Sequence, residues 1–141
     1  MLFVKAALLA IAGATGGILT QLLGGFDHLI KALIMFMVID FISGWLAVTL
    51  FKKSEKADPE RPPKTTRLQG IIKKACMLLM VIVAVHLDGL LGTNSLTRDA
   101  LIIAFSTNEL LSILENMGDM GIKMPEVLAN ALEILGKRKN D

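Results

Sequence analysis

Long apolar segments separated by charged stretches are the main pattern of this chain. Four such segments occur, with 18, 20, 17 and 15 residues, at 6–23, 32–51, 75–91 and 100–114. A hydrocarbon core needs about 20 helical residues, with a working range of roughly 17–25, so the first three are long enough to cross it. Backbone groups in lipid must be paired within a helix or a closed barrel, and these blocks lack the alternation of barrel strands. The pattern predicts an all-α integral membrane protein with three to four transmembrane helices.

The fourth segment is the ambiguous one. A helix of its 15 residues would be only about 22 Å long. It would cross the membrane by borrowing flanking residues and thinning the bilayer, or else it would be re-entrant or lie in the interface. Length alone leaves these alternatives open.

The charged loop at residues 52–74 favours four spans. It holds eight of the 15 Lys and Arg residues, which places it in the cytoplasm by the positive-inside rule. Four spans then put both termini in the cytoplasm, whereas three would leave the basic tail outside. Pro59, Pro62 and Pro63 predict an extended middle for this loop. The cations that we assign to topology and lipid headgroup contact are Lys52, Lys53, Lys73, Lys74, Lys137, Arg138 and Lys139.

The first apolar segment carries small residues on one helix face, with Gly13 and Gly17 at its centre. Small residues let two helix backbones approach closely in lipid, so we expect a packing or oligomerisation face. Its partner is either another segment of the same chain or another copy. The segment also resembles a signal peptide with a cleavage site at Ala12-Gly13-Ala14, but the apolar run continues nine residues further, which favours a retained span.

An acidic residue, Asp40, lies in the middle of the second segment, on one face with Ser43 and Gly44. A carboxylate there costs at least about 2.5–3.5 kcal/mol on insertion scales, so it needs a partner or water. It is either protonated and hydrogen-bonded to a neighbouring helix, or exposed to an aqueous lumen, or part of a proton relay. We assign this face to helix packing and oligomerisation.

The fourth segment has a polar stripe opposite a Leu and Ile face. Such a helix requires a polar partner, a lumen or the membrane surface. Asp88, near the outer end of the third segment, is close enough to the boundary to reach water in part. The side chains that we assign to a polar stripe or lumen are Asp88, Ser106, Glu109, Ser112 and Asn116.

The chain divides at residue 116 into a transmembrane domain, 1–116, and a C-terminal region, 117–141. Pro125 suits the first turn of a helix, and an apolar stripe from Val127 to Leu135 precedes the basic tail. This pattern predicts an amphipathic helix on the cytoplasmic membrane surface, or one packed on another subunit.

Neither composition nor motifs favour catalysis. There is no phosphate-binding Gly loop, metal-ligand set or nucleophile elbow, so we expect no enzyme activity, catalytic residue, cofactor or metal. The single cysteine, Cys76, lies in an apolar run. The net charge is only +2, and no aromatic residue lies in the basic loop to stack on a base, so we expect no nucleic-acid partner.

Four stretches, in order, resemble a known family. They are Leu33–Gly44 with its Asp-x-x-x-Gly pattern, Gly70–Ala75 before a span that ends at Asp88, Asn108–Asn116, and Gly121–Pro125. The chain is similar to the phage lysis and toxin-secretion holins of Gram-positive systems, including the small Bacillus phage type. The loop before Gly70 is longer and richer in proline here.

The resemblance implies a bacteriophage-type protein that forms homo-oligomers in the cytoplasmic membrane of a bacterial host. It implies lesions that release an endolysin or a toxin, without required direct contact, and host cell lysis. A small ion channel or transporter subunit that uses Asp40 and Glu109 is the main alternative, and a passive scaffold is the second.

Overall fold

A computed structural model of the chain describes the backbone of residues 1–50 and 63–140, and the side chains of residues 1–50 and 67–137. The fold is all-α, as predicted, and the described residues contain no strand. The helices are α1 (Leu2–Leu22), α2 (His28–Leu50), α3 (Pro63–Leu91), α4 (Leu96–Asp119) and α5 (Glu126–Asn140).

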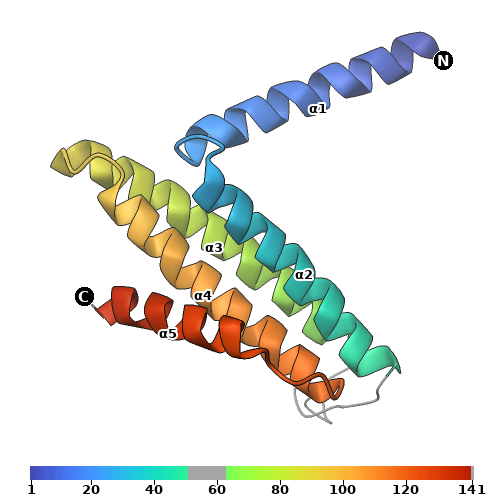
Figure 1. Cartoon of the computed structure of the whole chain (residues 1–141). Helices are drawn as coiled ribbons and strands as arrows, with labels where there is room; N and C mark the ends of the chain where they lie inside the picture. The colour runs from blue at the N-terminus through green and yellow to red at the C-terminus, as the bar shows by residue number, and fades with distance from the viewer. Residues whose placement is uncertain (51–62, 141) are drawn as a thin grey trace.

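Helices α2, α3 and α4 form an up-down-up bundle, in which α4 packs against both α2 and α3 (Figure 1). The tight α3–α4 turn uses Gly92 and Asn94, which both adopt positive φ angles. Helix α5 folds back along α4 of the same chain.

The apolar core lies at the end of the bundle where α1 joins α2. It consists of Leu23, Ile30, Leu33, Met37, Val81 and Ile102. Large apolar side chains also cover the outside of the bundle, including Ile42, Leu79 and Val83, which are 49%, 59% and 57% exposed. A soluble protein rarely leaves so much contiguous apolar surface, so these residues mark a lipid-facing exterior.

Three helical stretches are long and apolar enough to cross a membrane: Leu2–Leu22, His28–Leu50 and Arg67–Leu91. Helix α4 is not among them because of its charges, so the preferred count of four spans is not confirmed. Its length is no longer an obstacle. With 24 residues α4 is about 36 Å long, because it extends beyond the 15 apolar residues at both ends.

The expected loop 52–74 is shorter than its polar composition indicates. Helix α3 starts at Pro63, a residue whose fixed φ suits the first helical position, and continues through Gly70. The polar residues 63–74 are therefore helical. Lys52 and Lys53 lie outside the described residues.

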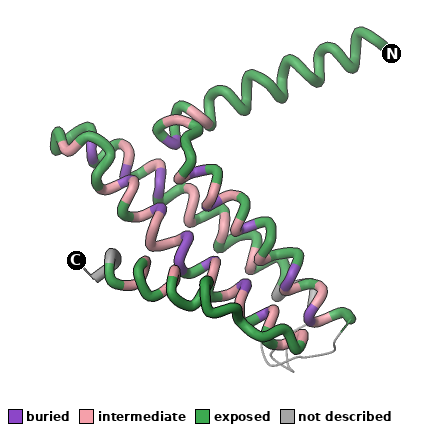
Figure 2. Tube along the Cα trace, viewed as in Figure 1, coloured by how far each residue is buried: buried purple, intermediate pink, exposed green. Residues whose placement is uncertain are grey.

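Helix α1 extends away from the bundle, and all but one of its residues are exposed (Figures 1 and 2). No side chain of α1 is buried. An added Cβ atom at Gly13 or Gly17 would meet nothing within 4 Å. The small-residue face thus has no partner within the described part of this chain.

Candidate functional site

Helix α4 presents a mixed polar and apolar face to the rest of the bundle. Its buried residues are Arg98, Ile102, Ser106, Thr107, Glu109, Ile113 and Asn116, which recur at helical spacing along one side. This one face organises two polar clusters, one that extends from the middle of α4 toward its C-terminal end and one at its N-terminal end. We call them the Lys74 cluster and the Arg98 cluster.

The Lys74 cluster joins all three bundle helices. Lys74 of α3 donates to Asp40 Oδ2 of α2 at 2.7 Å and to the carboxylate of Glu109 on α4. The three side chains are only 17%, 14% and 8% exposed. Removing charges from water is costly, and pairing inside one protein offsets part of that cost. One cation thus satisfies acids from two different helices.

Asn116 connects the same cluster to the small-residue face of α2. Its Nδ2 donates to Asp40 Oδ1 at 3.1 Å and to Ser43 Oγ at 3.0 Å. Ser43 Oγ in turn donates to the backbone oxygen of Asp40 at 3.1 Å. A Cβ atom at Gly44 would lie 3.4 Å from Asn116 Nδ2, so the glycine permits the close approach of α4. The structure thereby brings together residues predicted separately on α2 and α4.

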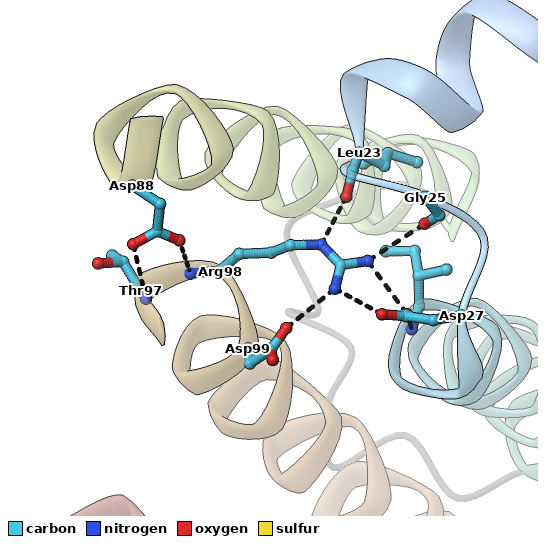
Figure 3. Close-up of polar contacts among 8 residues, drawn as sticks. Leu23, Gly25, Asp27, Asp88, Thr97, Arg98 and Asp99 are labelled. Atoms are coloured by element: carbon cyan, nitrogen blue, oxygen red, sulfur yellow. Dashed lines mark hydrogen bonds and ion pairs between the residues drawn. The ribbon is translucent and has the colours of Figure 1, made fainter. Parts of the chain in front are cut away.

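The Arg98 cluster lies at the opposite end of the bundle, where the α1–α2 connection meets the start of α4 (Figure 3). Arg98 is 2% exposed, and its Nε donates to the backbone oxygen of Leu23 at 2.6 Å. Nη2 donates to the backbone oxygen of Gly25, and both Nη atoms donate to the Asp27 carboxylate at 2.7 and 3.1 Å. Nη1 also donates to Asp99 at 2.9 Å. Every N–H direction of the guanidinium is therefore used within this connection.

Gly24 is required by this arrangement. Its φ is +82°, and a Cβ atom there would lie 2.8 Å from Arg98 Nε. The neighbouring Asp27 also accepts from the Ile30 backbone N–H at 3.1 Å, so it caps the start of α2. The hydrogen bonds from Arg98 hold the pKa of the Asp27 carboxyl below its usual range.

Asp88 does not join the polar stripe of α4 with which it was grouped. It is 3% exposed and accepts from Thr93 Oγ1 at 2.6 Å and from the backbone N–H groups of Thr97 and Arg98 at 2.9 and 2.8 Å. Ser95, the N-cap residue of α4, makes no side-chain capping bond. Asp88 therefore caps α4 from the end of α3, where a carboxylate also complements the helix dipole (Figure 3).

The remaining predicted residues are dispersed. Ser106 is buried, and within the described residues its Oγ has no hydrogen-bond partner. Ser112 and Lys73 line a cleft between α2 and α3. Lys137 pairs with Glu133 on α5 at 3.2 Å. The side chains of Arg138 and Lys139 lie outside the described residues.

Sequence reasoning missed the roles of Lys74 and Arg98. Lys74 was grouped with Lys73 as a loop cation, although its place three helical residues N-terminal to Met77 puts it on the bundle side of α3. Arg98 was not singled out in the sequence. The one sequence feature that could have indicated its role is an arginine just before an apolar segment, in a chain that also has the Gly24-Gly25-Phe26-Asp27 connection. In the described part of the chain, no group of three His, Cys, Asp or Glu side chains is placed to hold a metal ion.

The comparisons with known proteins agree with this membrane architecture. The sequence profile of the bacteriophage holin family matches residues 17–137. An uncharacterized protein of Listeria innocua is 41% identical over 127 residues, which cover 89% of this chain and 84% of that protein. A probable holin of Bacillus phage phi105 is 29% identical over 98 residues, covering 70% of this chain and 67% of that protein. No solved structure matches the chain.

Proposed function

The chain belongs to the bacteriophage holin family, and we propose that it accumulates in the cytoplasmic membrane of a bacterial host, self-assembles and opens lesions. An endolysin or a toxin would leave through these lesions without direct contact, and the host cell would lyse. The similarity to a probable phage holin supports this proposal.

The observation that carries the proposal is the inward-facing polar face of α4. Within one protomer, Glu109 and Asn116 contact Lys74 and Asp40 instead of lipid. A single copy therefore pairs Asp40, Lys74, Glu109 and Asn116 internally and would be able to accumulate without opening the membrane. The same groups, turned toward water between many copies, would line a lesion.

This mechanism places a closed state and an open state close in free energy. The closed state keeps charges away from water, and the open state hydrates them at the cost of the helix contacts. Collapse of the membrane potential would shift this balance by about 2.3 kcal/mol for each charge moved across 100 mV. Such a shift would couple the first lesion to the opening of further copies.

We assign self-assembly to α1, whose Gly13 and Gly17 have no neighbour in the protomer. Close helix contact through small residues is the main source of packing energy between spans in lipid. Another copy is the partner that the membrane offers in increasing amount as the protein accumulates.

For topology we propose four spans with both termini in the cytoplasm. Two of the charges on α4 are paired within the protein, since Arg98 contacts Asp27 and Glu109 contacts Lys74. Paired charges that face protein are tolerated at membrane depth. The basic loop and tail then lie together on the cytoplasmic side.

Coexpression with a cell-wall hydrolase that lacks its export signal tests the function. We expect abrupt lysis with both proteins, loss of viability without wall degradation with this chain alone, and no lysis with the hydrolase alone. A chain that dissipates the proton gradient but never releases the hydrolase would instead be a small ion channel or transporter subunit. Asp40→Asn separates the two further, because a proton relay should stop and a hydrogen-bonded packing site should largely tolerate the amide.

A further inference from the structure

The bundle is close-packed at one end and hollow at the other. Near the end of α2 and the start of α3, a cleft of about 360 Å³ lies between the two helices, and residues of α4 also line it. Its walls include the apolar side chains of Phe41, Val48 and Met77, and the absence of a side chain at Gly70 widens it. In a membrane, lipid molecules are available to fill a cleft between two lipid-facing helices.

The mouth of the cleft is cationic. Arg67 and Lys73 line it, and no ion pair joins either of them to an acidic side chain in the described part of the chain. The Arg67 guanidinium lies 5.8 Å from the centre of the Trp45 ring and donates to Thr49 Oγ1 at 3.4 Å, which fixes it over the opening. Lys74, deeper in the cleft, is already occupied by Asp40 and Glu109.

The depth of these groups matches that of a lipid. Arg67 and Lys73 precede the apolar segment that begins at Ala75, so they lie toward the headgroups when α3 crosses the membrane. Gly70, Lys74 and Met77 follow Arg67 on the same face of α3 over about 15 Å of helix. The cationic mouth therefore lies at phosphate depth, and Phe41 and Met77 line the cleft closer to acyl-chain depth.

We propose that this cleft binds one anionic phospholipid, with its phosphate between Arg67 and Lys73 and an acyl chain against Phe41 and Met77. Arginine presents a planar fork of donors that fits a phosphate. Basic pockets between spans on the cytoplasmic side suit anionic headgroups. A zwitterionic lipid brings its own cation to the same mouth and is bound less tightly.

Trp45, the one tryptophan of the chain, lines the cleft and reports on its occupant. The full-length protein is reconstituted in phosphatidylcholine vesicles that contain a minor share of phosphatidylglycerol, with bromine on the acyl chains of one lipid at a time. We expect brominated phosphatidylglycerol to quench Trp45 more strongly than the same mole fraction of brominated phosphatidylcholine. Equal quenching by the two lipids would overturn the proposal.

Arg67→Gln and Lys73→Gln should each weaken the preference for phosphatidylglycerol about fivefold, and the double variant should remove it. Lys31→Gln, which removes a cation from the other end of the bundle, is the matched control and should leave the preference unchanged. Gly70→Leu should fill the cleft and reduce quenching by both lipids while both cations remain. Far-UV circular dichroism checks that each variant is folded. A preference that survives in the double variant would show that surface charge elsewhere causes it.

Two further measurements identify the occupant. Inorganic phosphate in the buffer should not relieve the quenching by phosphatidylglycerol, whereas a site for free phosphate would be competed and the lipid proposal would fail. Quenching should also be independent of the protein-to-lipid ratio. If it falls as that ratio rises, a second copy of the chain occupies the cleft and the proposal is wrong.

Discussion

Lys74 Nζ lies 2.7 Å from Asp40 Oδ2, so the polar start of α3 is tied to the middle of α2. The same ammonium group reaches Glu109 on α4. The carboxylate that the sequence places in the middle of the second apolar segment therefore faces a cation from its own chain.

Lys74→Met should destabilise the protomer, because it leaves two carboxylates without their cation. Breaking a buried pair from one side costs about 3–5 kcal/mol, and the residual 17% exposure of Lys74 places this one at or below the lower limit. Thermal unfolding in detergent and membrane accumulation would both be measured. Lys73→Met removes the same charge at an exposed neighbour and should have little effect. An unchanged melting temperature for Lys74→Met would show that the pair contributes nothing.

Gly24→Ala should destabilise the α1–α2 connection. The alanine must adopt a φ of +82°, which costs about 1–2 kcal/mol, and its Cβ must displace the Arg98 side chain. Gly25→Ala is the matched control because it has a positive φ of +107° and no atom within 4 Å of its Cβ. The difference between the two melting temperatures measures the contact with Arg98. If both variants lower the melting temperature equally, backbone strain accounts for the whole effect.

The Arg98–Asp27 contact should make stability depend on pH in the acid range. The pKa of Asp27 is lowered in the folded protein, so the unfolded chain binds the proton more readily. The contribution is complete above the unfolded value of about 3.9 and is lost as the pH falls below it through the folded pKa. Melting temperatures from pH 6 down to the acid limit should fall less steeply for Asp27→Asn than for the unmodified chain. If the melting temperatures of the two proteins fall equally with pH, Asp27 does not cause the pH dependence.

Gly13→Leu with Gly17→Leu should reduce self-assembly without affecting the bundle. Neither position has an atom within 4 Å of an added Cβ, so the leucines meet no part of the protomer. They would keep two α1 helices apart, and we expect less cross-linked oligomer and delayed lysis. Thr15→Leu adds bulk on the opposite side of α1 and should retain both. Normal oligomers in the glycine variant would assign assembly to another surface.

Four spans predict opposite locations for the two ends of α4. In a Cys76→Ser background, a cysteine at Asn94 should react with an impermeant maleimide from outside the cell. A cysteine at Lys123 should react only after the membrane is permeabilised. If both react from outside, α4 does not cross and the chain has three spans. The Cys76→Ser chain without an added cysteine shows the background labelling.

The sequence predicted the helical membrane fold because segment length and hydropathy follow directly from the thickness of the bilayer. Its polar periodicity also identified Glu109 and Asn116 as one stripe, and Asp40 with Ser43 and Gly44 as another. It did not show that these stripes meet, since that depends on how three helices pack. Lys74 was missed for a related reason. A lysine beside a basic loop has the same local pattern whether it faces lipid headgroups or enters the bundle.

The Arg98 cluster was even harder to predict from the sequence. Two of its acceptors are the backbone oxygens of Leu23 and Gly25, which carry no residue-type signal. The length of α4 was underestimated because polar residues at both of its ends, among them the paired Arg98 and Asp99, were counted as loop residues. Hydropathy measures the cost of a charge in lipid, and it does not register a partner supplied by another helix.

The two polar clusters both include residues of α4. Arg98 and Glu109 belong to one continuous helix, so a rotation of α4 in the proposed opening would have to break both clusters. The free-energy costs of the two releases would then add in a single step, which would favour an all-or-none change over a gradual one.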